Sequence, residues 1–230
     1  MAIKPELTNN AFLTRVEQSL FPSITHACAK CDTGYAGPEC VKLIKPALTN
    51  AESVIHALIH SVIGEPEREG LEETPKRVVK AWKHWTSGYN VDIPGLLKVF
   101  DDGAEGYDEM VIRKGIRIYS HCEHHLAPII GECTIAYIPN GRVVGLSKLD
   151  RLADAFARRL QVQERMTTQI ADALMEHLQP KGVGVYINAR HMCVESRGVQ
   201  QHNSDTITSA LRGVFKAEES TRAEFMALVR

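Results

Sequence analysis

The sequence contains no run of about 18 or more apolar residues, the length that a membrane-spanning helix requires. Its N-terminus, MAIKPELTNN, also lacks the basic segment and hydrophobic run of a secretory signal. Neither sign of charge dominates, because 27 Lys and Arg residues balance 28 Asp and Glu residues. These absences predict a cytoplasmic protein with no membrane or nucleic-acid partner, in which any anion site is built from a local cluster of cations.

Cysteine is also scarce, with six residues at positions 28, 31, 40, 122, 133 and 193. They are too unevenly spaced for a small disulfide scaffold, so metal binding is the special use expected in a reducing compartment. Cys28, Cys31 and Cys40 lie close to His26 in the irregular segment 22–46. They either form a second, structural zinc knuckle or are idle thiols in a loop.

Two helices are predicted in the first half of the chain. One follows the capping-box spacing of Thr49 and Glu52, and its apolar residues recur at helical intervals as far as Gly64. The other has Thr74 as N-cap, followed by a proline at the first helical position, and runs towards Gly88.

Short β-rich runs replace this helical pattern from about residue 110. Strands are expected over residues 110–120, 132–139, 142–146, 182–193 and 205–215. Asn140-Gly141 predicts a hairpin between the second and third of them. Helices are expected from Ser147 as N-cap, over 162–178 and over 221–229. Strands, two consecutive helices and further strands predict an α+β domain.

A thiol and an imidazole occur at Cys-x2-His spacing in the segment 122–125, directly after a predicted strand. Taken alone, Cys122 and His125 are as typical of a reduced core cysteine near a surface histidine as of a zinc site. His191 and Cys193 change this balance, because residues two apart on a strand share a face and both can point into one pocket. Cys193 is therefore a candidate third ligand.

Three protein ligands with an open fourth position are typical of catalytic zinc, which can activate a water near neutral pH. Three further side chains beside these ligands are candidates for proton transfer: His124, His191 and Glu123. The arrangement indicates a hydrolase. A zinc nucleobase deaminase is excluded, because neither its H-x-E nor its P-C-x-x-C signature occurs around 121–133 or 191–193.

Two pairs of cations lie at the starts of predicted helices. Lys148 and Arg151 share the first turn after Ser147, where free N–H groups and the helix dipole favour a phosphate. Arg77 and Lys80 have the same spacing in the earlier helix. For both pairs the alternative is a solvated basic face.

Gln163 and Glu164 are adjacent near another helix start, a position that also suits an exposed pair. A carboxylate can accept two hydrogen bonds from the N–H edge of a guanine, which makes this pair a candidate for base recognition.

Four motifs, CEHH, GLSKLDR, QVQER and HMCVESRG, together resemble the GTP cyclohydrolase I family in order and spacing, from about Glu73 to the C-terminus. The resemblance implies a single catalytic zinc held by Cys122, His125 and Cys193. It implies an acid/base pair, His124 and His191, and a guanine site, Gln163 and Glu164. The groups implied at the ribose and triphosphate are Ser147, Lys148, Arg151, Arg197, Arg77 and Lys80.

The reaction implied is the conversion of GTP and water to 7,8-dihydroneopterin triphosphate and formate, with zinc supplying the nucleophile and the histidines relaying protons. The product could feed folate, tetrahydrobiopterin or deazaguanine synthesis. The alternatives are a catalytically silent ring-forming relative, which would be expected to have lost a ligand or a histidine, and another enzyme of the same fold, whose motifs differ.

The fold implied is the tunnelling fold, an antiparallel four-stranded sheet backed by two helices, and the assembly implied is a homodecamer of two stacked pentameric rings. In such a ring Arg77 is expected to act at a neighbouring subunit's site. The expected organisation is an N-terminal extension with the cysteine-rich loop over 1–46, a helical region over 47–104 and the catalytic domain over 105–230.

Overall fold

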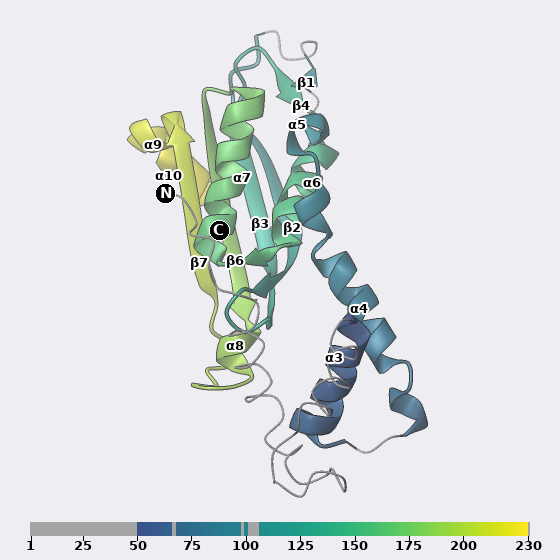
Figure 1. Cartoon of the computed structure of the whole chain (residues 1–230). Helices are drawn as coiled ribbons and strands as arrows, with labels where there is room; N and C mark the ends of the chain where they lie inside the picture. Colours follow the sequence, from purple (N-terminus) through teal and green to yellow (C-terminus); the bar gives the residue numbers. More distant parts are fainter. Residues whose placement is uncertain (1–49, 66–67, 98, 101–105, 230) are drawn as a thin grey trace, which may run out of the picture. The chain divides into compact units, whose positions relative to one another are not determined.

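The computed structural model of the chain describes residues 50–65, 68–97, 99–100 and 106–229. The predicted zinc knuckle of Cys28, Cys31 and Cys40 lies outside these residues. The chain divides into two compact units, residues 1–82 and 83–230, which are taken in turn (Figure 1). Within the described part, no helix combines the length and the apolar character needed to cross a membrane.

The first unit contains α3 (Ala51–Leu58), which continues as the π-helical segment Ile59–Ile63 and stops at Gly64 with a φ of 76°. The side chain of Asn50 caps α3 by accepting a hydrogen bond from the Glu52 amide at 3.0 Å. The cap is therefore one residue later than the Thr49 that the sequence pattern predicts. A 3-10 turn (Glu69–Leu71) follows.

The next helix, α4 (Thr74–Trp85), begins at Thr74, so Thr74 lies within the helix instead of preceding it as the predicted N-cap. The 3-10 segment Ser87–Asn90 and the short helix α5 (Ile93–Leu96) already belong to the second unit, which begins at Lys83. Helices are therefore present where the apolar periodicity predicts them, and the differences are confined to their ends.

The second unit is built on an antiparallel sheet in the order β2-β3-β6-β7. Its strands are β2 (Val111–Cys122), β3 (Pro128–Ile138), β6 (Gly182–His191) and β7 (Thr206–Gly213). A two-residue strand, β5 (Leu160–Gln161), pairs in parallel with the end of β2. The four long strands confirm the predicted order of strands and helices, whereas β5 is too short for a periodic signal.

The predicted hairpin between β3 and the next strand is wrong. Gly141 does make a turn, with a φ of 76°. However, β4 (Val143–Val144) pairs with β1 (Val99–Phe100) in a separate two-stranded sheet. The reason is tertiary: β2 and β6 already pair with the two edges of β3, so β3 has no edge left for β4.

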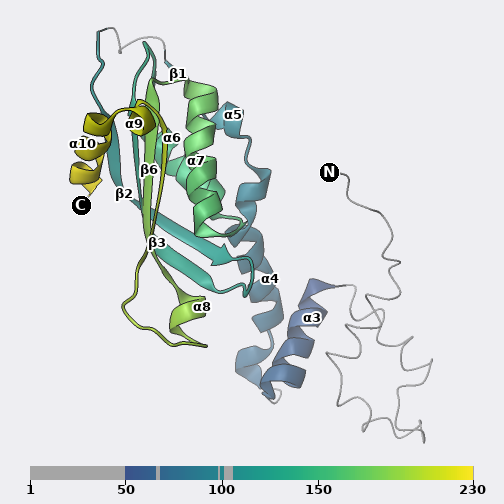
Figure 2. The same ribbon diagram turned by 90° about the vertical axis from the view of Figure 1, so that its left-hand side faces the viewer.

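Two helices, α6 (Leu146–Ala157) and α7 (Gln163–Leu178), cover one face of this sheet (Figure 2). The N-cap of α6 is Gly145, and Ser147 lies within the first turn instead of capping it. The core between helices and sheet is formed by fully buried aliphatic side chains, including Ile118, Ile135, Leu149, Leu152, Ile170, Leu174 and Val185. Burial of such side chains is the main stabilising contribution to the fold.

A smaller core lies on the opposite face, beneath α9 (Val214–Ala217) and α10 (Glu219–Val229). The rings of Phe215 and Phe225 meet there edge to face, with centroids 5.5 Å apart. Gly184 of β6 makes room for them, because a Cβ at this position would come within 2.8 Å of the Phe215 ring. Phe225 is thus the fully buried side chain by which α10 packs against the sheet, and Met226 and Val229 pack beside it.

We expect Phe225→Ala to lower the midpoint of thermal unfolding clearly, because loss of a fully buried aromatic side chain costs about 3–5 kcal/mol. Leu228→Ala, on the same helix but 42% exposed, is the matched control and should change the midpoint little. Equal effects of the two substitutions would show that α10 is not held through this aromatic pair.

Candidate metal centre and active site

The register of the sheet brings two distant parts of the sequence together at one end. In β2 and β3, His121 pairs with Pro128, and in β3 and β6, Ile129 pairs with His191. Because neighbouring strands are antiparallel, the C-terminal ends of β2 and β6 lie on either side of the start of β3. The loop after Cys122 and the turn after His191 are therefore adjacent.

The loop that follows β2 is tight and is held by backbone hydrogen bonds. The Cys122 amide donates to the Ala127 carbonyl at 2.8 Å, and the Leu126 amide donates to the Cys122 carbonyl at 2.8 Å. Leu126 takes a left-handed conformation with a φ of 54°, which closes the turn. The Glu123 amide donates to the Gln161 carbonyl of β5 at 3.1 Å, so the short parallel strand also fixes this loop.

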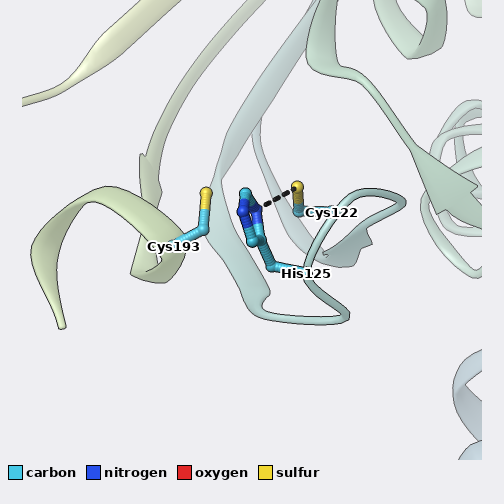
Figure 3. A group of neighbouring side chains, drawn as sticks. All are labelled: Cys122, His125 and Cys193. Carbon is cyan, nitrogen blue, oxygen red and sulfur yellow. Dashed lines mark hydrogen bonds between the residues drawn. The ribbon is translucent and has the colours of Figure 1, made fainter. Parts of the chain in front are cut away.

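Three side chains converge at this end of the sheet: Cys122, His125 and Cys193 (Figure 3). Their candidate ligand atoms all lie within 4.8 Å of one another. Nδ1 of His125 is 3.8 Å from Sγ of Cys122. This is the ligand set that the sequence predicts, and its members come from the end of β2, from the β2–β3 loop and from α8 after β6.

The argument that led to Cys193 is wrong in one respect. Strand β6 ends at His191, and Cys193 lies in the short helix α8 (Met192–Glu195), so the two residues do not share a face of a strand. The chain turns directly after the strand, and His191 is the N-cap of α8. Cys193 reaches the cluster through this turn.

The donor set suits a metal ion of borderline softness. Two thiols and one imidazole are ligands that zinc and similar ions accept. Burial raises the pKa of the Cys193 thiol, and the nearby Cys122 sulfur raises it further. A cation bound between the two sulfurs would offset both effects, because a metal favours the deprotonated thiol. The three residues therefore fit a metal ion.

Glu123, one of the expected proton carriers, forms an ion pair with Arg165 at the start of α7. Arg165 donates two hydrogen bonds to its carboxylate, at 2.7 and 2.8 Å. These hydrogen bonds are the main reason that the pKa of Glu123 is lowered. The carboxylate is therefore held ionised, and the pair ties the ligand loop to α7.

The two histidines of the expected acid/base pair have different surroundings. His191 is partly buried, and its Nε2 lies 2.7 Å from Oε1 of Gln163. Burial lowers the pKa of His191, and the charge of Glu164 opposes this effect. The side chain of His124 is 63% exposed and lies 3.9 Å from the Glu123 carboxylate. Both histidines flank the cluster.

The α6 residues Ser147, Lys148 and Arg151 are not brought to the cluster within one chain. Asp150, in the same turn, accepts two hydrogen bonds at 2.9 Å from Arg113, which lies near the start of β2. Cys122 is at the other end of that strand, about 30 Å away at the rise of an extended chain. Figure 1 accordingly shows the start of α6 near β4 and the cluster end of the sheet near α8.

The remaining cations lie in two other places. Arg197 follows α8, and its charge acts on the Cys193 thiol, which places it at the cluster end of the sheet. Arg77 and Lys80 are exposed on α4 in the first unit, and Arg77 donates to the Glu73 carboxylate at 2.9 Å.

Sequence reasoning missed an ion pair beside Cys193, in which a buried Glu195 meets an exposed Arg190. Glu195 is 4% exposed and accepts a hydrogen bond from Nε of Arg190 at 2.8 Å, and a second bond joins the same two side chains. The pair links the α8 turn to the end of β6. No periodic pattern predicts it, since both residues are charged and only the turn after His191 places them together.

An α+β chain with two thiols, an imidazole and flanking histidines at one end of its sheet has the layout of a metal-dependent hydrolase. Residues 51–230 match the family model of GTP cyclohydrolase I, and the chain belongs to this family.

Bacterial relatives named "GTP cyclohydrolase 1" resemble it over most of their length. One from Janthinobacterium sp. (strain Marseille) is 57% identical over 187 residues, which cover 81% of this chain and 93% of the relative. One from Chlorobium phaeovibrioides is 47% identical over 211 residues, which cover 91% of this chain and 93% of the relative. One from Nitrosospira multiformis is 56% identical over 171 residues, which cover 74% of this chain and 90% of the relative.

Among solved structures, "Crystal structure of the archaeosine synthase QueF-Like in the apo form" matches with a TM-score of 0.38 and 18% identity, covering 45% of this chain and 93% of the other. This likeness is too low to bear on the fold or the activity.

We expect Glu195→Gln to weaken metal binding by about 10-fold or more, because groups that support metal ligands commonly have effects of this size. The substitution removes the charge that holds Arg190 and the α8 turn. Glu176→Gln is the matched control, since the side chain of Glu176 is 75% exposed on α7. Competition with a chelating dye measures both affinities, and equal values would contradict a supporting role for Glu195.

Proposed function

We propose that this chain carries out the GTP cyclohydrolase I activity of its family with one zinc ion held by Cys122, His125 and Cys193. The family match and the relatives assign the activity: the enzyme opens the imidazole ring of GTP hydrolytically. The observation that carries the zinc proposal is the convergence of two thiols and one imidazole within 4.8 Å. When bound, zinc would supply Lewis-acid activation of water near neutral pH.

The products proposed are 7,8-dihydroneopterin triphosphate and formate, the first step towards pterin-type cofactors or deazaguanines. The histidines beside the cluster are proposed to transfer protons during ring opening. His191 stays neutral near pH 7 because burial lowers its pKa, so it can accept a proton. His124, whose side chain is largely exposed, can exchange protons with solvent. Glu123 contributes by holding the loop through Arg165.

Guanine recognition is proposed for the start of α7. Glu164 is exposed there, and its charge reaches His191, so its carboxylate lies on the same side as the cluster. An ionised carboxylate in this place can accept hydrogen bonds from the N–H edge of the base, and a site built this way discriminates strongly against other bases. Gln163, the other residue expected at the guanine, is fully buried and its side-chain amide bonds groups of its own chain, so base recognition is proposed for Glu164 alone.

The triphosphate site is proposed to be shared between subunits. Ser147, Lys148 and Arg151 have the residue types and the helix N-terminus that suit phosphates, but in one chain they lie at the far end of the sheet from Cys122. One GTP cannot span this separation. We therefore propose a homo-oligomer, a decamer of two pentameric rings with the tunnelling fold, in which α6 of a neighbour completes each site.

Arg197 is proposed to contribute from the same chain as the zinc ligands, and Arg77 and Lys80 to add further cations from a neighbouring subunit. Residues 105–230 then form the catalytic domain, residues 47–104 a helical region and residues 1–46 an extension. Cys122, Cys133 and Cys193 are free thiols, which the reducing cytoplasm would preserve.

When the purified protein is incubated with GTP, the proposal predicts that formate and a pterin that fluoresces after oxidation are formed. It also predicts one zinc ion per cluster. Cys193→Ser should lose both zinc and turnover. His124→Ala is the matched variant: it should keep zinc but lower turnover by about 10² or more, since it removes only a proton carrier. Metal analysis and the formate assay on the same samples separate the two effects.

Full zinc at the cluster with normal turnover in Cys193→Ser would overturn the ligand assignment. Normal turnover in His124→Ala would instead remove that histidine from the proton relay while leaving the zinc site in place.

A shared site also predicts that two inactive variants rescue each other. Arg151→Ala and Cys193→Ser, co-expressed so that they assemble together, should regain activity in roughly one site in four, by random mixing of two chain types in a symmetric ring. These sites combine intact zinc ligands from one chain with an intact α6 from its neighbour. The control is the same pair mixed after separate assembly, which should remain inactive.

A monomeric protein with GTP turnover would contradict the shared site. The same is true of well-mixed rings that remain inactive.

A further inference from the structure

The side chain of Gln163 is fully buried at the start of α7, beneath the end of β6 and the start of β7. Its Nε2 lies within hydrogen-bonding distance of three acceptors: the Ile187 carbonyl at 3.2 Å, the Thr206 carbonyl at 2.9 Å and the Thr208 hydroxyl at 3.1 Å. Its Oε1 lies 2.7 Å from Nε2 of His191. The amide is therefore surrounded by groups of its own chain.

These neighbours determine which end of the amide faces which group. Backbone carbonyls only accept hydrogen bonds, so the end of Gln163 that faces Ile187 and Thr206 must be the NH2 group. The reversed amide would place Oε1 against two carbonyl oxygens in a buried position, which is costly. Oε1 is consequently the atom that faces His191.

The two threonine hydroxyls can be assigned in the same way. Thr167 Oγ1 is 2.7 Å from the Gln163 backbone carbonyl, so Thr167 must donate there. Thr167 then has no proton left for Thr208, whose Oγ1 is also 2.7 Å away, and Thr208 must be the donor of that bond. With its proton used, Thr208 can only accept from Gln163. The donor and the acceptor of each contact are thereby assigned, with the two hydrogens of the Gln163 NH2 group shared among three acceptors.

We infer that Gln163 is a positioning residue that fixes the proton of neutral His191 on Nε2 and leaves Nδ1 as the free acceptor. Oε1 of Gln163 carries no proton, so His191 must donate to it. The hydrogen bond made by one ring nitrogen sets the state of the other. This inference rests on the proposed function and deepens it by naming the ring nitrogen of His191 that is left without a proton.

The contact also fixes the orientation of the His191 ring, because Nε2–H has one acceptor in a definite place. The fixed orientation comes from Thr208 and the two carbonyls, which hold the amide of Gln163.

The test is to determine the tautomer of His191 in the zinc-loaded full chain labelled with 15N-histidine, by magic-angle-spinning NMR without GTP. The His191 signals are those lost in His191→Asn. At a pH where the imidazole is neutral, Nε2 should resonate as a pyrrole-type nitrogen and Nδ1 as a pyridine-type nitrogen. Gln163→Met should mix or reverse the two forms. The control Gln169→Met, further along α7, should leave them unchanged.

Thr208→Val is the milder variant, because it removes one hydroxyl from the network and leaves Gln163 in place, while Thr208→Ser keeps the hydroxyl. With GTP as substrate, Gln163→Met should lower kcat about 10-fold or more with little change in KM. Thr208→Val should change kcat in the same direction, and Thr208→Ser should not.

A proton on Nδ1 of His191 in the unmodified protein would overturn the inference. An unchanged tautomer in both Gln163→Met and Thr208→Val would also overturn it, and a rise in KM alone would assign Gln163 to guanine binding instead. The tautomer is measured without substrate. Absence of GTP turnover in the unmodified protein would therefore count against the proposed function, and the NMR result would still decide the role of Gln163.

Discussion

The antiparallel register of β2, β3 and β6 is the constraint on which the site depends. It sets Cys122 at the end of one strand beside the turn that follows His191 at the end of another, with the start of β3 between them. A shift of one residue would turn the side chains of a strand to the opposite face and break the core beneath α6 and α7. The packing that stabilises the sheet therefore also holds the candidate metal ligands in place.

At this end of the sheet, polar contacts hold the loop after β2, the α8 turn and the start of α7, which lie at the edge of the hydrophobic core. The Glu123–Arg165 pair joins the ligand loop to α7, and the buried Glu195 holds the α8 turn through Arg190. The amide of Gln163 connects α7 with β6, β7 and His191. Each contact orients a group that is proposed to bind the metal or to carry protons, which is the supporting role that metal sites and catalytic sites require.

Much of this arrangement could be predicted from the sequence where the signal was local. The Cys-x2-His segment and the order of strands and helices are examples, and the cluster of Cys122, His125 and Cys193 is present. The hairpin at Gly141 failed because its strand had no free partner, which is a tertiary fact. The partners of Gln163 and Glu195 depend on strand register, and the separation of Lys148 from the cluster depends on strand length, so no short pattern contains them.

The claim central to this account is that two sulfurs and one imidazole hold a single zinc ion with one position open. X-ray absorption at the zinc edge tests it most directly, on protein in which Cys28, Cys31 and Cys40 are replaced by serine. The account predicts two sulfur neighbours at about 2.3 Å and two nitrogen or oxygen neighbours at about 2.0–2.1 Å. Four sulfur neighbours, or none, would contradict it.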